Sequence, residues 1–215
     1  MIIGMDKRKY TLRKRAAQQD ETRQRIVEAT MALHEELGPR LTTISAIAER
    51  AGVQRLTVYR HFGDETALFQ ACTVCWLERH PPPALPAVVA NDASAAEAAT
   101  REGLHALYRY YAGTRRMWEV SYRDVELVPA MHGPMQDVVD HMAAYRDALV
   151  SAWPGPQDSP MLRATLALGV HFATWRTLAD QGLDDGAMAA LVARWASAAA
   201  AEASANPTPA RTSSA

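Results

Sequence analysis

The stretch from Leu41 to Phe62 constrains the fold of this chain more than any other, and it reads LTTISAIAERAGVQRLTVYRHF. Apolar residues recur at helical spacing at Ile44, Ile47, Ala48 and Ala51. Gly52 is expected to end this helix, and Val53 is expected to be a buried apolar residue of the turn. Residues 54–61 predict a second short helix. Two short helices joined by a tight turn indicate a helix-turn-helix unit.

The rest of the chain also predicts helices. Of its 215 residues, 48% are hydrophobic and 22% are charged, which is ordinary for a globular protein. Ala, Leu, Glu and Arg dominate the composition, and alternation of apolar with polar residues is nowhere sustained. We therefore expect an all-α protein of about nine helices.

Capping residues and helix breakers predict the ends of several helices. The expected N-caps are Thr22, Thr42 or Thr43, and Asp64, and the expected helix ends are Gly38-Pro39 and about Arg79. Later in the chain, the pattern predicts two helices between about residues 95 and 125, a long helix over 135–149, one over 161–178 and a last one after Gly182.

The net charge of −1 conceals an asymmetry along the chain. Up to Phe62 there are 12 Lys and Arg against 7 Asp and Glu, and from Gly63 onward there are 11 against 17. A basic front on an acidic body predicts that only the front meets a polyanion. For residues 7–15 alone, a tail that merely aids solubility stays an equal alternative to an arm that lies along a DNA groove.

The second short helix carries a specific set of side chains on its exposed face. Arg pairs with guanine through two hydrogen bonds, Gln pairs in the same way with adenine, Thr contacts a thymine methyl group, and Tyr or His bonds a phosphate. The set comprises Gln54, Arg55, Thr57, Tyr59, Arg60 and His61. One amphipathic helix does not need this mixture, so we interpret it as a DNA-reading surface.

Residues 22–68 resemble the DNA-binding domain of the tetracycline-repressor (TetR) family of transcriptional regulators. The family pattern of Thr, Ile and Ala in the first helix, Thr-x3-IA-x2-AGV in the second and T-[LV]-Y-x-HF in the third is matched. The matching residues are Thr22, Ile26, Ala29, Gly38, Thr43, Ile47, Ala48, Ala51, Gly52, Val53, Thr57, Val58, Tyr59, His61, Phe62 and Leu68.

The resemblance assigns roles to individual side chains. It implies phosphate contacts from Thr43, Tyr59 and His61. It implies base contacts from Gln54, Arg55, Leu56, Thr57 and Arg60, and Ser45 completes the DNA-binding candidates.

Two positions depart from the family pattern. Many members have a small residue or Pro where this chain has Leu56, and many have Lys at the start of the fourth helix where this chain has Glu65. Glu cannot bind phosphate as Lys does, although it suits a helix N-terminus electrostatically. We therefore expect Arg60 or the basic N-terminal arm to substitute for the missing Lys contact.

The chain divides into four predicted parts: a flexible basic arm at 1–20, a three-helix helix-turn-helix DNA-binding domain at 21–68, a helical ligand-binding and dimerisation domain at 69–203, and a disordered tail at 204–215. Small residues in the last two helices allow a second copy to approach closely, and the family resemblance favours a homodimer over packing within one chain.

These features predict a homodimeric, ligand-responsive transcriptional regulator, most simply a repressor. It would bind a pseudo-palindromic operator in double-stranded DNA and be released by a small apolar or aromatic effector. The alternative is an all-α small-molecule binding protein with little DNA affinity, for which Leu56 and Glu65 are the only support.

Aromatic, methionine and polar side chains of the predicted body are candidates for a small-molecule pocket. They are Trp76, Tyr108, Tyr111, Trp118, Tyr122, Met135, His141, Met142, Tyr145, His171, Trp175 and Arg176. Most aromatic residues on helical stripes belong to the core, and we expect about a third of these residues to line a cavity.

No sequence motif predicts catalysis, a cofactor or a metal site. Cys72 and Cys75 form a C-x-x-C, but it lies inside a predicted helix with no second Cys pair, so we interpret both as small buried hydrophobic residues. The opening residues lack the apolar core of a signal peptide, and no apolar run is long enough to span a membrane. We therefore expect a cytoplasmic protein without membrane contact.

Overall fold

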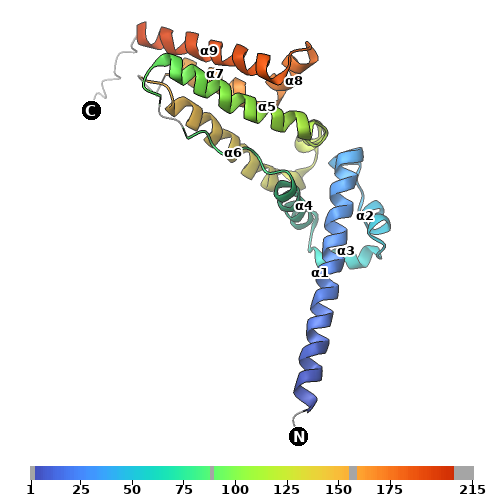
Figure 1. Ribbon diagram of the computed structural model, residues 1–215. Helices are drawn as coiled ribbons and strands as arrows, with labels where there is room; N and C mark the ends of the chain where they lie inside the picture. Colours follow the sequence, from blue (N-terminus) through green and yellow to red (C-terminus); the bar gives the residue numbers. More distant parts are fainter. Residues whose placement is uncertain (1–2, 88–89, 155–158, 206–215) are drawn as a thin grey trace, which may run out of the picture. The chain divides into compact units, whose positions relative to one another are not determined.

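The computed structural model describes residues 3–87, 90–154 and 159–205, and in these ranges it contains nine α-helices, three short 3-10 helices and no strand (Figure 1). The α-helices are α1 (Ile3–Leu37), α2 (Ile44–Ala51), α3 (Arg55–His61), α4 (Glu65–Arg79), α5 (Ala93–Asp124), α6 (His132–Ser151), α7 (Pro160–Val170), α8 (Phe172–Asp180) and α9 (Asp185–Ala205). The 3-10 helices are η1 (Pro39–Leu41), η2 (Val125–Leu127) and η3 (Pro129–Met131). The prediction of an all-α protein with about nine helices is confirmed.

The helices form two compact units. The first unit comprises residues 1–81 and 116–136, and the second comprises residues 82–115 and 137–215. Helix α5 is continuous, with its residues up to 115 in the second unit and its later residues in the first. The first unit therefore holds more than the helix-turn-helix, since it includes α4 and the end of α5, beyond the boundary expected at residue 68.

The core of the first unit forms where α1, α2, α3 and α4 meet. Its buried members are Ile26, Val27, Ala29, Leu33, Ile47, Ala48, Ala51, Val58, Phe62, Leu68 and Cys75. Among the members from α1, Ile26, Ala29 and Leu33 step by three and four residues, which puts them on one face of that helix, and Val27 lies next to Ile26 at the edge of this face. Each large side chain buried in this way stabilises the fold by about 1.5–3 kcal/mol, so α2 and α3 are held as a rigid pair.

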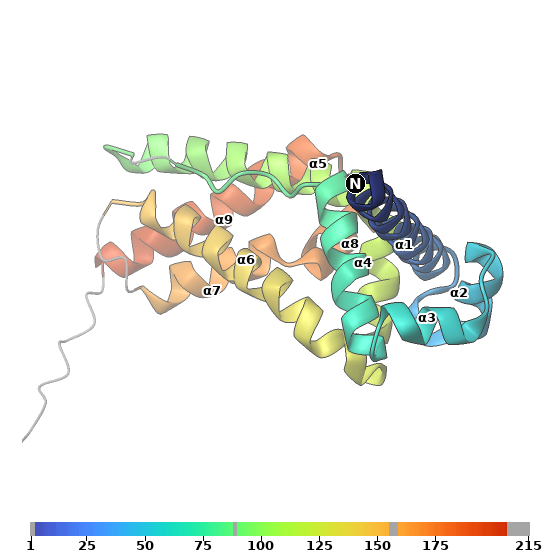
Figure 2. The same ribbon diagram turned by 90° about the horizontal axis from the view of Figure 1, so that it is seen from below.

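In the second unit, α5, α6, α7 and α9 run alongside one another (Figures 1 and 2). Three buried tyrosines join these helices, because each hydroxyl donates a hydrogen bond to a backbone carbonyl of another helix. The pairs are Tyr108 with Gly169 (2.8 Å), Tyr111 with Val170 (2.7 Å) and Tyr145 with Gly103 (2.8 Å). Two of these carbonyls lie at the C-terminal end of α7, where a helix leaves its carbonyls without partners of its own.

The expected irregular arm at residues 1–20 is corrected by the structure, because residues 3–20 continue α1 without a break. Residues 1–2 lie outside the described ranges. Thr22 is not an N-cap: it lies inside α1 and donates its hydroxyl hydrogen bond to the carbonyl of Gln18 at 2.8 Å. Lys, Arg, Gln and Ala have high intrinsic helix propensity, so they can form a helix even where no apolar face is present. The lack of apolar periodicity therefore did not indicate irregular structure.

Three further helix boundaries differ from the prediction. The two helices expected between about residues 95 and 125 are one, α5, because an exposed Gly113 costs too little to interrupt it. The helix expected over 135–149 begins earlier, at His132, so Gly133 and Pro134 lie in the first turn of α6. Pro is tolerated there because the N–H groups of a first turn have no partner within the helix. The helix expected over 161–178 is broken at His171, whose Nδ1 caps α8 by accepting a hydrogen bond from the Ala173 N–H at 3.2 Å.

Helix α9 runs to Ala205, two residues into the predicted disordered tail, and residues 206–215 lie outside the described ranges. None of the helices in the described part of the chain has the length and apolar character that crossing a membrane requires.

Candidate nucleic-acid interface

The first helix of the predicted helix-turn-helix, α2, has a defined capping residue at each end. Thr43, one of the two predicted candidates, is the N-cap of α2, since its Oγ1 accepts a hydrogen bond from the Ala46 N–H at 3.2 Å. Gly52 ends α2 with φ 66° and ψ 39°, a left-handed conformation that costs a residue with a Cβ about 1–2 kcal/mol. This glycine allows the abrupt change of direction from α2 to α3.

Helix α3 is short and buries only one face against the core. Gln54 is its N-cap residue, and the Thr57 N–H donates to the Gln54 carbonyl at 2.8 Å. Val58 and the following Phe62 are almost fully buried. The remaining face of α3 points away from the core, as the sequence predicted.

Six of the predicted DNA-binding residues lie together on this outward face or at its start. Leu56 is 55% exposed and Tyr59 is 46% exposed, although both are large and apolar enough to be stable in a core. In the described part of the chain, the side chains of four of these residues make no hydrogen bond or ion pair. They are Gln54, Arg55, Thr57 and Arg60. Their donors and acceptors are thus available to another molecule.

The remaining predicted residues frame this face. Thr43 and Ser45 are exposed at the start of α2, and His61 is half-buried at the end of α3. The Thr43 oxygen already accepts one hydrogen bond, and its O–H remains available as a donor.

Two arginines that the sequence reading did not single out attach α1 to this motif. Arg23 Nη1 donates to the backbone carbonyl of His61 at 3.2 Å, and its guanidinium lies 4.2 Å from the centroid of the Phe62 ring. Arg25 Nη1 donates to the carbonyl of Ala51 at 3.1 Å. Both cations therefore meet the partially negative C-terminal ends of α3 and α2. No local pattern in the sequence marks these contacts, since they join residues 26 and 38 positions apart.

The start of α4 carries carboxylates and no Lys. Asp64 is the N-cap, as predicted, and its Oδ1 accepts a hydrogen bond from the Ala67 N–H at 2.7 Å. Glu65 is exposed in the first turn. This end of α4 is therefore electrostatically satisfied by the chain itself.

The C-terminal end of α1 is capped by arginines of α5. Arg116 donates to the carbonyls of Glu35 and Glu36, both at 2.9 Å, and Arg123 donates to the carbonyl of Leu37 at 3.1 Å. These carbonyls belong to the last turn of α1, which has no partners for them within the helix.

A buried carboxylate completes this junction. Asp124 is 1% exposed, accepts hydrogen bonds from the Arg123 guanidinium at 2.6 and 2.8 Å, and accepts one from the Arg40 N–H at 3.0 Å. The hydrogen bonds from Arg123, with the charge of that group, lower the pKa of the Asp124 carboxyl. Gly38 closes the junction with φ 89°, and a Cβ there would overlap the guanidinium of Arg123.

Cys72 and His34 are buried side by side in the first unit. Cys72 Sγ lies 3.8 Å from His34 Nδ1, and the His34 ring stacks on Phe69 with centroids 4.6 Å apart. Burial raises the pKa of the Cys72 thiol to about 12 and lowers the pKa of His34 to about 4. The thiolate, which is the nucleophilic and metal-binding form, is therefore scarce at neutral pH. In the ranges that the structure describes, no group of three or more His, Cys, Asp or Glu side chains is placed to hold a metal ion.

The twelve predicted ligand-binding residues are divided between the two units. Trp76, Trp118, Tyr122 and Met135 belong to the first unit. Tyr108, Tyr111, His141, Met142, Tyr145, His171, Trp175 and Arg176 belong to the second.

Within the second unit, the predicted ligand residues have different environments. Tyr108, Tyr111, Tyr145 and Trp175 are buried, whereas His171 and Arg176 are exposed. Trp175 lies close to Tyr111 and donates a hydrogen bond from Nε1 to Asp185 Oδ1 at 3.2 Å. These contacts are those of core residues, and the ligand assignment stays a prediction.

A surface groove in the second unit lies elsewhere, between the start of α5 and α9. It has a volume of about 470 Å³ and is lined by Ala93, Ser94, Glu97, Ala98, Arg101, Ala190, Arg194 and Ser197. None of the twelve predicted residues contributes to its lining.

Sequence comparison relates the helix-turn-helix to known proteins. Residues 26–72 match the model of a family described as bacterial regulatory proteins, tetR family. Over 59 residues, the chain is 42% identical to two proteins of Pseudomonas putida, the HTH-type transcriptional regulator SrpR and the uncharacterized HTH-type transcriptional regulator TtgW. These alignments cover 27% of this chain, 28% of SrpR and 44% of TtgW, so the chain spans less than half the length of either relative.

Structural comparison extends the likeness to most of the chain. A TetR-like transcriptional regulator from Rhodococcus sp. RHA1 superposes with a TM-score of 0.53 at 22% identity, covering 81% of this chain and 93% of that one. FadR from Bacillus subtilis, in complex with stearoyl-CoA, superposes with a TM-score of 0.54 at 16% identity, covering 82% and 98%. At these identities, the shared property is the fold.

Proposed function

We propose that this chain is a transcriptional regulator of the tetR family, which binds double-stranded DNA through α3, and the match of residues 26–72 to the model of that family supports the proposal. One observation carries the proposal: a rigid, short helix presents Leu56 and Tyr59 to solvent beside polar side chains that have no partner in the described part of the chain. Exposure of this kind on a packed scaffold is typical of a binding surface.

The chemistry of the side chains divides the contacts into two kinds. Gln54, Arg55 and Arg60 carry the donors and acceptors that pair with purine edges in the major groove. Tyr59 and the Thr43 hydroxyl carry single donors, which suit phosphate oxygens. The first kind selects the sequence, and the second fixes the position of the helix on the duplex.

The proposed assembly is a homodimer formed through α7, α8 and α9, the segment predicted as the last two helices. Support comes from exposed apolar side chains on two of them, Met161 and Leu168 on α7 and Trp195 on α9. A two-fold axis repeats α3, so the operator would be a pseudo-palindrome with half-sites about one helical turn, roughly 34 Å, apart.

The proposed response is release from DNA when a small molecule binds, which makes the protein a repressor acting in the cytoplasm. FadR, which has a similar fold, was crystallised with stearoyl-CoA, a molecule with a long apolar acyl chain, and this supports proposing an effector with an apolar part. Because a ligand shifts an equilibrium only through unequal affinity for two states, the effector must bind the state that fits DNA less well.

The test uses gel-shift titrations on DNA from upstream of the gene, with the wild-type protein and the variants Arg55→Ala and Tyr59→Ala. Wild-type binding should weaken as salt rises, and each variant should lose roughly 10-fold or more in affinity, equivalent to at least about 1.4 kcal/mol. Arg109→Ala, an exposed arginine of the second unit, is the matched control and should bind as the wild type does.

The alternative of a small-molecule binding protein predicts a different outcome. Such a protein would be retained weakly on heparin, with little dependence on salt. Normal DNA binding by both α3 variants would contradict the assignment of these residues.

A further inference from the structure

Residues 12–21 of α1 pack against nothing in the part of the chain that the structure describes. Every side chain from Leu12 to Glu21 is exposed. Beyond Glu21, the first buried side chain along α1 is that of Ile26. Figure 1 shows this part of α1 extending past α2 and α3. A helix with no buried face gains no stability from packing, so this surface is available to a partner.

The composition of this segment selects the class of partner. Residues 7–15 contain six Lys and Arg and no Asp or Glu. Tyr10 and Leu12 are its only large apolar residues, and they do not form the continuous apolar stripe that a coiled coil or a membrane-surface helix requires. Concentrated positive charge without an apolar face fits a polyanion.

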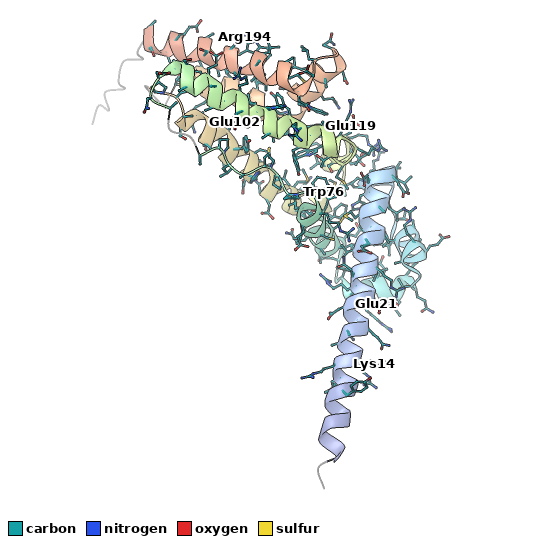
Figure 3. All side chains as sticks on the ribbon, in the orientation of Figure 1. Lys14, Glu21, Trp76, Glu102, Glu119 and Arg194 are labelled. Atoms are coloured by element: carbon teal, nitrogen blue, oxygen red, sulfur yellow. The ribbon has the colours of Figure 1, made fainter. Side chains whose placement is uncertain are left out.

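The contacts of Arg23 fix the position of α1 relative to α3 and, through α1, the position of residues 7–15. Arg23 binds the carbonyl of His61, so α1 crosses the C-terminal end of α3 at this residue. Lys14 precedes Arg23 by nine positions, which corresponds to about 13 Å along a helix axis. Figure 3 shows Lys14 projecting from the part of α1 that lies beyond Glu21 and away from the other helices of the first unit.

We propose that the exposed half of α1 is a second DNA-binding element, which contacts backbone phosphates outside the half-site contacted by α3. The proposal rests on the proposed function of α3. If α1 runs along the duplex, its length of about 13 Å between Arg23 and Lys14 spans about four base pairs, so each protomer should protect about that much additional DNA. Lys and Arg bind phosphates of any sequence, and these contacts therefore add affinity without base preference.

The continuity of α1 distinguishes this element from a flexible arm. A helix joined without a break to the core residues of α1 directs its charges along one line, set by the Arg23 and Arg25 contacts. Binding should therefore depend on an intact helix between the basic turns and Arg23, in addition to the charges themselves.

The charge is tested with a triple variant, Arg13→Gln, Lys14→Gln and Arg15→Gln, on DNA selected from a random pool by the wild-type protein. If each residue neutralises one phosphate, the slope of log K against log salt should fall in magnitude by about 2.7. The matched control is Arg101→Gln, Arg109→Gln and Arg194→Gln, three exposed arginines of the second unit, which should leave the slope unchanged.

The helix is tested with Gln18→Pro, which keeps every charge but interrupts α1, against Gln18→Ala. Because residue 18 is exposed, neither change should alter the unfolding of the core. Hydroxyl-radical footprints should lose the outer protection of about four base pairs with Gln18→Pro and keep it with Gln18→Ala.

The outcomes separate this inference from the proposed function. A wild-type protein that binds no DNA overturns both. Wild-type binding with an unchanged salt slope in the triple variant overturns the second DNA-binding element alone. A reduced slope with an unchanged Gln18→Pro footprint overturns its helical form.

Discussion

Tyrosines in two parts of this protein have opposite environments. Tyr59 on α3 is 46% exposed, whereas Tyr108 and Tyr111 on α5 are fully buried and donate hydrogen bonds to carbonyls at the end of α7. The sequence reading assigned all three a binding role. Residue type alone therefore does not separate recognition from packing, because a tyrosine is available for recognition only where its ring and hydroxyl are not already used within the chain.

The arginines of the first unit show the same contrast. Arg55 and Arg60 of α3 have no partner in the described part of the chain, whereas Arg116 and Arg123 are engaged by carbonyls of the last turn of α1. We expect the first pair to affect DNA binding and the second pair to affect the stability of the junction between α1 and α5.

The largest expected effect comes from removing a buried ring in the second unit. Tyr111→Ala deletes a side chain that packs against Phe172 and Trp175, and large-to-small core changes of this kind cost about 3–5 kcal/mol. Urea unfolding followed by circular dichroism measures the loss. In the α3 counterpart, Tyr59→Ala, the unfolding free energy should change by less than about 0.5 kcal/mol, and equal losses in the two variants would remove the contrast.

The next effect concerns acid and the packed interior of the first unit. His34 has its pKa lowered from 6.5 to about 4 by burial, so the unfolded chain binds a proton more readily than the folded one. Its contribution to stability is complete above pH 6.5 and is lost as the pH falls toward 4, by on the order of 3 kcal/mol.

Unfolding free energies measured between pH 7 and about 4 test this dependence. His34→Phe keeps a ring beside Phe69 without a titrating group, so it should flatten the profile in this window. Asp124 does not interfere, because its lowered pKa moves its own contribution below 3.8. A parallel pH profile for the variant would show that His34 is not the group responsible.

A smaller loss is expected from Gly38→Ala. The backbone at Gly38 has φ 89° and ψ 155°, a conformation that is almost confined to glycine and costs other residues about 1–3 kcal/mol. A Cβ there also displaces Arg123 from the junction. Gly63→Ala is the control, since nothing lies within 4 Å of its Cβ position, and thermal unfolding should separate the two variants clearly.

The smallest expected effect isolates one hydroxyl. Tyr108→Phe keeps the ring but leaves the Gly169 carbonyl without this donor, which should cost about 1–2 kcal/mol. Tyr59→Phe removes an exposed hydroxyl and should leave the unfolding free energy within about 0.5 kcal/mol of the wild type. Calorimetry on the two variants compares buried and exposed hydroxyls directly, and a stability loss in Tyr59→Phe as large as in Tyr108→Phe would count against the distinction.

The parts of the structure that could be predicted from sequence are those determined locally. Gly52 and Asp64 mark the turn and the start of α4, because a left-handed glycine and a capping carboxylate act on their own neighbours. The outward face of α3 followed from the spacing of its apolar residues.

The parts that could not be predicted depend on distant residues or on the absence of packing. The contacts of Arg23 and Arg116 join residues 38 to 81 positions apart, which leaves no local signal. The N-terminal half of α1 has no apolar face, and a helix of this kind has the same polar pattern as an irregular arm. Tyr108 and Tyr111 were ambiguous because buried aromatic residues and pocket residues share one sequence signature.

The role of α3 in reading DNA is tested by selecting bound DNA from a random pool with the wild-type protein and with Arg55→Ala. The wild type should enrich a pseudo-palindrome with half-sites about one helical turn apart. The variant should lose its preference at the same position of each half-site and keep the others, as expected for a side chain that reads one base pair. An enriched sequence identical for both proteins, or no enrichment by the wild type, would contradict the claim that α3 reads DNA.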